Sequence, residues 1–237
     1  MTNLFSEQSS WSKRCVEIWP ILLVTALLVA CGDDDSDFAT RPSGDSSSNS
    51  IYRSGLCNVE TDENCFKDDR DGQTYKIVTI EDQVWMGENL NYETSASYCL
   101  KDDATNCIKY GRLYTWAAAL SACPDGWHLP SRSEWETLLS AVGGESTAGT
   151  KLKSTSGWNS SANGTDAYGF SALPAGVRNG DTYSDSGGYY AQFWSATEGY
   201  SGYAYSISLY HDPALAAEVG YGFNDENSGK SVRCLKD

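Results

Sequence analysis

The chain has 237 residues and a formal net charge of −15, from 17 basic and 32 acidic side chains. This acidity argues against binding to nucleic acid or to anionic lipid headgroups, because both partners require basic patches. It is compatible with calcium or with neutral polysaccharide, although plain soluble extracellular proteins are often acidic as well.

The first 30 residues are typical of a bacterial lipoprotein signal peptide. A short basic segment at 13–14 precedes an apolar run over 18–30, which is shorter than the ~20 residues of a membrane-spanning helix. The run ends in the sequence LVAC at 28–31, which resembles the lipobox whose cysteine is acylated. We therefore expect Cys31 to carry lipid that anchors the protein to the membrane. The alternative is an ordinary secreted protein with Cys31 as a spare thiol.

A flexible tether is expected to follow the anchor. The acidic residues 32–37 are either a signal for export to the outer face of the outer membrane or a solvated spacer. Residues 38–56 are rich in Ser, Asn, Asp and Gly, and bury too little apolar surface to become ordered. The sequence thus predicts an outer-membrane lipoprotein, exposed at the cell surface. Its parts are a signal peptide over 1–30, a lipidated tether over 31–56 and a single domain over 57–237.

Six cysteines remain once Cys15 leaves with the signal peptide and Cys31 carries lipid. An even number in an exported protein indicates disulfides, whereas zinc would require closely spaced cysteine pairs that the sequence lacks. Two pairs each enclose a short acidic loop that ends in Asn-Cys, and the remaining two cysteines lie far apart in the sequence. We therefore predict the disulfides Cys57–Cys65, Cys99–Cys107 and Cys123–Cys234.

The first predicted elements are a β-hairpin and a helix. Residues 73–80 and 83–86 are rich in strand-forming side chains and are separated by a short acidic turn. Residues 114–122 are rich in alanine and are predicted to be helical, with Trp116 and Leu120 on one face.

A second helix has the clearest local signals in the chain. Ser131 and Glu134 have the spacing of a capping box, and Gly143-Gly144 ends the segment. Short strands are then expected over 170–177, 190–196, 203–210 and 231–235. In the third of these, Ser206 and Ser208 alternate with apolar residues, which predicts one solvated face. The buried stripe of the helix is expected to be Trp135, Leu138, Leu139 and Val142.

Several of these segments resemble a known family. They are DGQTYKIVTIEDQVWMGENLNY, YGRLYTWAAAL, CPDGWHLPSRSEWETL, GTDAYGFSALPAGVR, FWSATE and SVRCLKD. In this order, over 71–237, they resemble the Fibrobacter succinogenes major paralogous domain. That family consists of exported, often lipid-anchored proteins that are largely uncharacterised.

A wider resemblance suggests the fold. Ala118, Ala119, Cys123, Gly126, Leu129, Glu134 and Leu138 follow the spacing of the first two helices of C-type-lectin-like domains. That fold bridges a helix cysteine to the last strand, which matches Cys123–Cys234, and formylglycine-generating enzymes share it broadly. The resemblance implies an α+β fold with two helices packed on a small twisted antiparallel sheet, long irregular loops and disulfide staples. The formylglycine-generating activity needs a reactive cysteine pair and is not expected here.

No catalytic or cofactor site is indicated by the sequence. His128 precedes a helix, where satisfying turn hydrogen bonds is the expected role, and His211 is expected at the surface. The calcium-binding tripeptides of C-type lectins are absent. Calcium remains possible at Asp102-Asp103 or at Asp181 with Asp185, without a motif that requires it.

Tyrosines supply the candidate binding surface. Eight of the 15 tyrosines lie between 183 and 221, among Gly, Ser and Asn, a composition found in adaptable binding loops. Some are expected to be ordinary strand residues. The sequence suggests a non-catalytic module that binds polysaccharide or another extracellular component. The alternatives are a structural or protein-binding module of the cell envelope and, less favoured, an enzyme. The candidate ligand-binding residues are Tyr183, Tyr189, Tyr190, Tyr200 and Tyr203.

Overall fold

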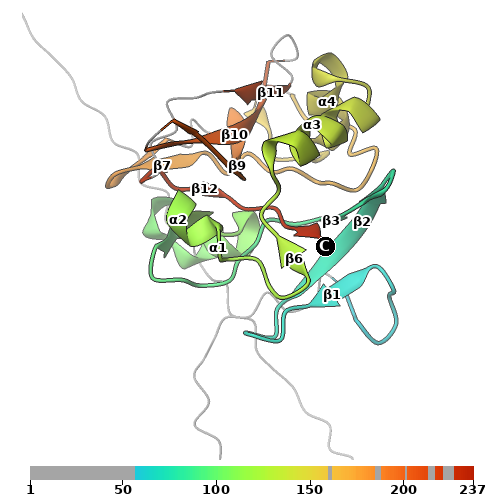
Figure 1. Cartoon of the computed structure of the whole chain (residues 1–237), viewed down its shortest axis with the longest axis horizontal. Helices are drawn as coiled ribbons and strands as arrows, with labels where there is room; N and C mark the ends of the chain where they lie inside the picture. Colours follow the sequence, from blue (N-terminus) through green and yellow to red (C-terminus); the bar gives the residue numbers. More distant parts are fainter. Residues whose placement is uncertain (1–56, 160–161, 185–187, 201, 213–216, 221–226) are drawn as a thin grey trace, which may run out of the picture. The chain divides into compact units, whose positions relative to one another are not determined.

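The computed structural model describes residues 57–237, with gaps at 160–161, 185–187, 201, 213–216 and 221–226. The expected signal peptide, Cys31 and the tether lie outside these residues. Within them the chain folds into an α+β domain with two larger sheets and a separate two-stranded sheet (Figure 1). No helix in this part of the chain is long and apolar enough to cross a membrane.

The first sheet has five strands in the order β1-β2-β3-β13-β6. Its centre is the predicted hairpin of β2 (Thr74–Ile80) and β3 (Gln83–Met86), which turns at Glu81 with a φ of 51°. The outer strands are β1 (Cys65–Lys67), β13 (Leu235–Lys236) and β6 (Trp127–His128).

The second sheet has six strands in the order β11-β10-β9-β12-β5-β4. The predicted strands β9 (Tyr190–Tyr200) and β10 (Tyr203–Tyr210) form a long antiparallel hairpin, so β9 extends beyond its expected end. The other strands are β11 (Ala217–Gly220), β12 (Lys230–Ser231), β5 (Leu113–Tyr114) and β4 (Ser97–Tyr98), and the separate hairpin is β7 (Val177–Asn179) with β8 (Thr182–Ser184).

The C-terminal segment joins the two sheets, because the strand expected over 231–235 is divided between them. β12 lies between β9 and β5, whereas β13 lies between β3 and β6. Between these strands, the carbonyls of Val232 and Cys234 accept hydrogen bonds from the backbone N–H groups of Leu90 and Met86. The disulfide Cys123–Cys234 then fixes this segment to the residues that precede β6.

The capped helix is confirmed as α3 (Arg132–Ala141). The Ser131 and Glu134 side chains form the reciprocal capping box, which stabilises a helix by about 1 kcal/mol. Figure 1 places α3 and α4 (Glu145–Leu152) beside β9, β10 and β11. The buried face of α3 contributes Trp135 to a cluster of aromatic rings, with Trp85 and Phe193 from the two main sheets and Phe170 from the segment between α4 and β7.

The prediction of two helices was incomplete. The described residues contain four α-helices, and α4 begins directly after Gly143-Gly144, so that glycine pair separates two helices. The expected helix over 114–122 is reduced to α2 (Trp116–Ala119), because Tyr114 already belongs to β5. Leu120, predicted to share a helical face with Trp116, is the C-cap of α2 and is 47% exposed. The remaining helix is α1 (Ala104–Tyr110), preceded by the 3₁₀ turn η1 (Leu100–Asp102).

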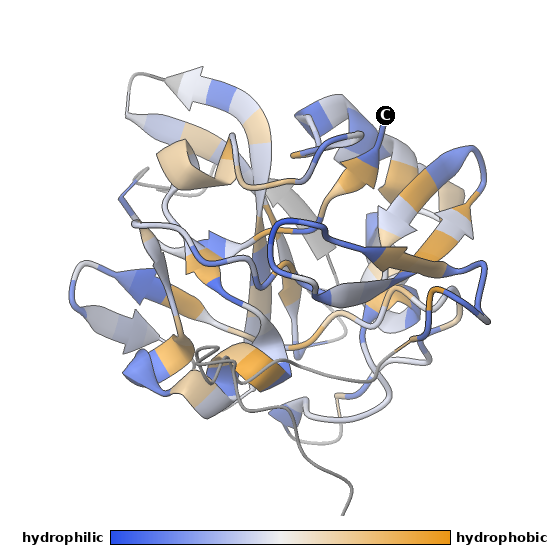
Figure 2. Ribbon diagram, turned by 90° about the horizontal axis from the view of Figure 1, so that it is seen from below, coloured by the Kyte–Doolittle hydropathy of each residue, from blue (hydrophilic) through white to orange (hydrophobic). Residues whose placement is uncertain are grey.

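Two predictions about strands were wrong. Most of 170–177 is irregular, and β7 begins only at Val177. Ser206 and Ser208 do not lie on a solvated face, because both are buried. Gln192 donates a hydrogen bond to Ser208 and accepts one from the buried Lys230, so other polar side chains cover this face of the sheet. In Figure 2 the strongly hydrophobic segments lie mainly in strands and helices, whereas the connecting loops are largely hydrophilic.

Candidate functional site

The three disulfides of the structure join the pairs expected from their spacing. The loop closed by Cys99–Cys107 contains two adjacent non-glycine residues with positive φ. Within η1, Lys101 and Asp102 are consecutive left-handed residues with φ values of 59° and 55°, a conformation that costs about 1 kcal/mol or more for residues other than glycine. Asp103 then caps α1 by accepting a hydrogen bond from the Thr105 N–H.

This backbone turn brings Asp102 to one of the candidate tyrosines. The Tyr183 hydroxyl, on β8, donates a 2.5 Å hydrogen bond to Asp102 Oδ1. Partial burial and the adjacent carboxylate raise the pKa of Tyr183 above its ordinary value, so the phenol remains a donor at neutral pH. The contact joins residues that are 81 positions apart.

Arg178 is held between two tyrosine rings at the same place. Its guanidinium carbon lies 3.8 Å from the centre of the Tyr98 ring and 6.0 Å from that of Tyr183, within the range of cation–π attraction. Arg178 Nη2 forms an ion pair with Asp181 Oδ1 at 3.0 Å. The Asp181 side chain is fully exposed, so water screens the attraction. Arg178 Nε is buried without a hydrogen-bond partner among the described atoms. We call Tyr98, Asp102, Arg178, Asp181 and Tyr183 the Arg178 surface.

Local backbone contacts explain how this surface is assembled. Arg178 exchanges two backbone hydrogen bonds with Gly229, at 2.9 and 2.8 Å. A Cβ atom at position 229 would lie only 3.0 Å from the Cβ of Arg178, so glycine permits this close approach. Tyr98 is on β4, at the edge of the six-stranded sheet. The surface therefore combines a sheet edge, a disulfide loop and a hairpin.

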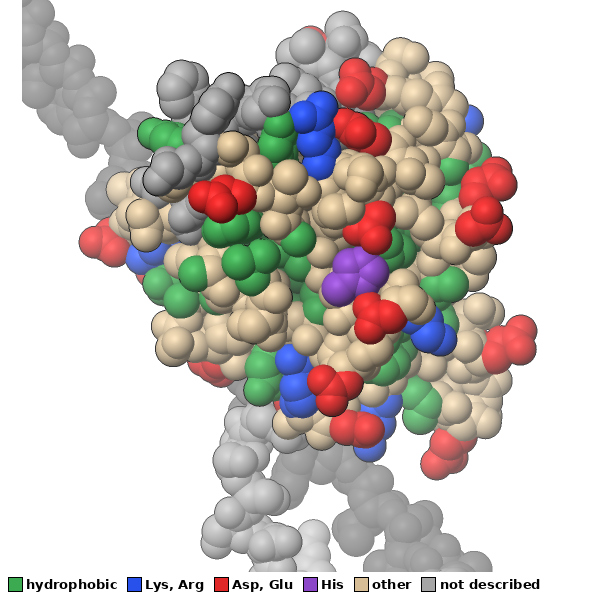
Figure 3. All heavy atoms as spheres, viewed as in Figure 1, with side chains coloured by type: hydrophobic (Ala, Val, Ile, Leu, Met, Phe, Trp, Pro, Cys, Tyr) green, Lys and Arg blue, Asp and Glu red, His purple; other side chains and the backbone are tan. Residues whose placement is uncertain are grey.

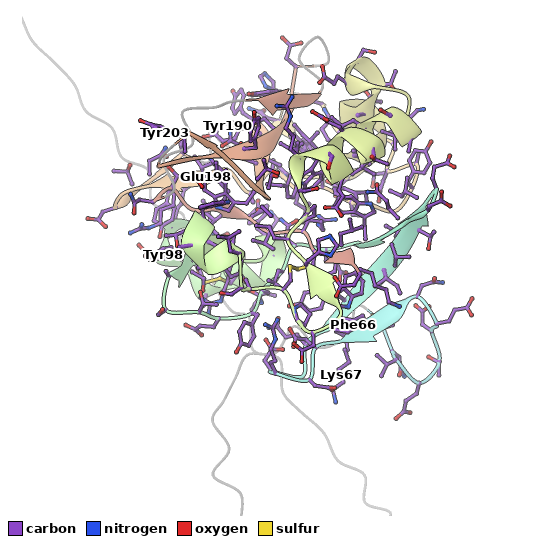
Figure 4. The ribbon with its side chains drawn as sticks, in the orientation of Figure 1. Phe66, Lys67, Tyr98, Tyr190, Glu198 and Tyr203 are labelled. Carbon is purple, nitrogen blue, oxygen red and sulfur yellow. A yellow bond between two sulfur atoms is a disulfide. The ribbon has the colours of Figure 1, made fainter. Side chains whose placement is uncertain are left out.

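The other predicted tyrosines do not join it. Tyr189 is 37% exposed and its ring contacts His211 at 4.5 Å, while the Tyr190 hydroxyl donates to the Ser184 carbonyl at 2.6 Å. Tyr203 is 43% exposed and pairs with residue 200, at the opposite end of the β9–β10 hairpin from Tyr190. Figure 4 shows Tyr203 and Tyr98 apart. The side chain of Tyr200 lies outside the described atoms.

Both histidines have structural contacts. His128 Nδ1 lies 2.7 Å from Asp237 Oδ1, and Nε2 lies 3.0 Å from Glu134 Oε1. Burial lowers the pKa of His128, but these two carboxylates outweigh it and the net shift is upward. Glu134 also forms the capping box of α3. The His128 imidazole therefore links the start of α3 to Asp237. This geometry agrees with the structural role expected for His128.

The acidic residues considered for calcium are partly engaged in other contacts. Asp102 accepts from Tyr183 and Asp103 caps α1. Asp185 lies outside the described residues, so the pair with Asp181 is not described. In the part of the chain that the structure describes, no group of three or more His, Cys, Asp or Glu side chains is arranged to hold a metal ion.

Sequence reasoning missed Tyr98 and Arg178. Tyr98 is in a two-residue strand, and Arg178 follows directly after the segment 170–177 that was expected to be a strand. They are 80 positions apart, and no periodic pattern connects them. The available signal was the sequence Asn179-Gly180-Asp181, which indicates a turn but not what the turn contacts.

Comparison with known proteins places the chain in a family. No curated protein and no solved structure matches it significantly. The family model described as the Fibrobacter succinogenes major domain matches residues 78–236. This match begins within β2, so it leaves out β1 but covers the rest of both main sheets, all of the Arg178 surface and two of the three disulfides. The chain therefore belongs to the Fibrobacter succinogenes major domain family.

Proposed function

We propose that this protein is a non-catalytic binding module at the cell surface, and that it contacts polysaccharide through the Arg178 surface. The observation that carries the proposal is the stacked arrangement of Tyr98, Arg178 and Tyr183, held in place by a strained disulfide loop. Non-glycine residues in left-handed conformations cluster at ligand-binding sites, where the surrounding structure maintains them.

The chemistry of the Arg178 surface suits a sugar ligand. Tyrosine rings are rigid and amphipathic, so they can stack on the apolar face of a sugar ring at a small entropic cost. Asp102 and Asp181 are exposed carboxylates that can accept hydrogen bonds from sugar hydroxyls, and Arg178 can donate them. The net negative charge of the chain favours neutral polysaccharide over strongly acidic polymers at this open surface.

Binding measurements on the full-length chain test this proposal. The protein is applied to an array of plant and bacterial glycans, and to insoluble cellulose and hemicellulose. Tyr98→Ala and Tyr183→Ala should each weaken binding by about tenfold or more, the equivalent of ~1.4 kcal/mol. Tyr189→Ala and Tyr203→Ala are matched controls that should change affinity by less than about twofold. Absence of binding to every glycan, or equal losses in all four variants, would contradict the proposal.

For the fold we propose a C-type-lectin-like arrangement. The supporting features are the disulfide between Cys123 and Cys234, and the pairing of β13 near the C-terminus with β3 and β6. An experimental structure in which these strands pair differently would remove its support.

For the location we propose lipid attachment at Cys31 and a place on the outer face of the outer membrane. Metabolic labelling with a fatty-acid analogue should label the intact chain and not the Cys31→Ser variant. Protease added to whole cells should degrade the labelled protein; protection until the cells are lysed would contradict the outward orientation.

A protein partner is the second candidate. Leu120 and Tyr203 are large side chains exposed by 47% and 43%, and hydrophobic side chains gather on the left half of the face in Figure 3. Aromatic and aliphatic anchors of this kind are common in protein interfaces. Loss of cell-envelope cross-linking in Leu120→Asp, with glycan binding unchanged, would support this second function.

A further inference from the structure

A small cavity lies at the C-terminal end of α1, where Lys109 and Tyr110 line it. Its volume is about 220 Å³, below the ~300 Å³ at which pockets for drug-sized ligands begin. Tyr110 lines the cavity, and both Tyr110 and Tyr183 pack against the cluster of Leu100, Leu113 and Ala175. The two sites therefore border the same cluster but share no lining residue. The other residues lining the cavity include Lys76, Glu88, Asn89, Lys109, Ser171 and Arg233.

The cavity is locally cationic in a strongly acidic chain. Lys76, Lys109 and Arg233 line it, against a single carboxylate from Glu88. Glu88 Oε2 already accepts a 3.0 Å hydrogen bond from the Lys76 backbone N–H. Three cations against one anion in a chain of net charge −15 is the reverse of the overall balance. Such a local excess attracts anions, most strongly at low salt.

Arg233 gives the cavity a fixed charge. It is 1% exposed, and its guanidinium donates to Asn89 Oδ1 at 3.1 and 2.6 Å and to the carbonyls of Met86 and Phe170. Asn89 is itself fixed, because its Nδ2 donates to the Tyr110 carbonyl at 2.8 Å. An arginine remains charged at any physiological pH. The charge is therefore preorganised before any ligand arrives.

The rim supplies exposed cationic side chains and a strained backbone. Lys76 and Lys109 are exposed, and Lys109 Nζ lies 4.7 Å from the centre of the Tyr110 ring, which also lines the cavity. Ser171 also lines the cavity in a left-handed conformation with a φ of 50°, held by hydrogen bonds of its N–H and hydroxyl to Asp166. The Tyr110 ring and Leu173 add apolar surface of the kind that a sugar ring can cover.

We propose that this cavity binds the carboxylate of a single acidic sugar residue, such as a uronic acid. Lys76 and Lys109 bind the carboxylate at the rim, and the buried charge of Arg233 adds attraction from the inner wall. Its small volume limits the ligand to about one sugar ring. This site is distinct from the Arg178 surface and does not depend on it.

Calorimetric titration of the full-length chain with galacturonic acid, glucuronic acid and galactose tests the proposal. At low salt, at least one uronic acid should bind about tenfold or more tightly than galactose, and added salt should weaken that binding. The double variant K76Q/K109Q should lose about tenfold in affinity. K67Q/K236Q removes the same charge from exposed positions outside the cavity lining and should change affinity by less than about twofold. Lys67 lies on β1, away from Tyr98, in Figure 4.

Three results would overturn this inference. The first is that neither uronic acid binds the wild-type chain more tightly than galactose does. The second is an equal loss in both double variants, which would indicate only net charge. The third is equal affinity for inorganic phosphate, which would indicate a general anion site. Retained uronate binding in Tyr98→Ala and Tyr183→Ala would show that the two sites are independent. A failure of one proposal therefore leaves the other testable.

Discussion

The loops closed by Cys57–Cys65 and Cys99–Cys107 have the same sequence separation of 8, but they make different contacts. In the first loop the described side-chain hydrogen bonds are mostly local: Asn58 accepts from the Glu60 N–H and Asp62 from the Asn64 N–H. One contact reaches β2, where the Thr74 hydroxyl donates to the Cys57 carbonyl at 3.3 Å. Val59 is 44% exposed, so little of that loop is packed. The second loop forms η1 and α1, buries Leu100 and places Asp102 against Tyr183.

The difference shows that two disulfide loops of the same length can have different structural roles. Both disulfides remove similar conformational entropy from the unfolded chain, because that contribution depends mainly on loop length. Only the second loop uses the constraint to hold two consecutive left-handed residues and to reach a distant hairpin. A disulfide loop therefore becomes part of a candidate site when side chains from distant parts of the chain pack against it.

The largest loss of stability is expected when the third disulfide, Cys123–Cys234, is removed. The losses from the two short disulfides are compared with it. Cys123→Ala/Cys234→Ala opens a loop with a sequence separation of 111, and should lower the free energy of unfolding by ~5 kcal/mol. Denaturant unfolding measures this loss. A loss no larger than that of either short loop would show that loop length does not set the order.

Removing each short disulfide tests the comparison directly. Cys57→Ala/Cys65→Ala and Cys99→Ala/Cys107→Ala should each lower the free energy of unfolding by about 2–3 kcal/mol, from chain entropy. Glycan binding should be lost only in the second pair, because only that loop positions Asp102. If both pairs lose binding equally at a temperature where both remain folded, the two loops are functionally equivalent and the distinction fails.

A double-mutant cycle isolates the long-range contact of the second loop. Asp102→Asn, Tyr183→Phe and the double variant should give a coupling free energy of about 1 kcal/mol, typical of a partly exposed hydrogen bond to a charged acceptor. Thermal or denaturant unfolding provides the four values. Glu63→Gln in the first loop, combined with Tyr183→Phe, is the control and should give additive effects.

The smallest effect concerns His128, which lies outside both loops. Its folded pKa is raised above 6.5, so its stabilising contribution is fully present below pH ~6.5 and is lost as the pH rises through the folded value. The side chain is 37% exposed, and solvent screening limits the contribution to under about 1 kcal/mol. Thermal melts across this pH range should show a decline that disappears in His128→Gln. A change in glycan binding over the same range would link this region to the second loop.

Local signals predicted part of the fold well. The cap and buried stripe of α3 lie within a dozen residues, so the sequence contains all of their information. The burial of Ser206 and Ser208 was not predictable from their own strand, because Gln192 and Lys230 come from other strands. The expected helix over 114–122 was too long for a related reason: β5 takes up its start and leaves α2 only one turn long.

The candidate site was harder to predict than the fold. Composition indicated the tyrosine-rich region, which includes Tyr183. The other candidate tyrosines lie at separate places, because their positions depend on strand register and exposure. Arg178 and Tyr98 meet only after β7 has paired with Gly229 and β4 with β5. Contacts of this kind depend on tertiary structure, and single-sequence periodicity does not contain them.

The position of the Cys57–Cys65 bond has a mechanical consequence. Cys57 is the first described residue, and Cys65 begins β1. A pulling force applied from the N-terminal side would pass through the sulfur atoms directly into β1, without extending residues 58–64. The load would then act on the backbone pairing of β1 with β2, which includes the register partners Cys65 and Lys76. The weakly packed first loop would thus be bypassed under tension, and the edge of the first sheet would resist the force.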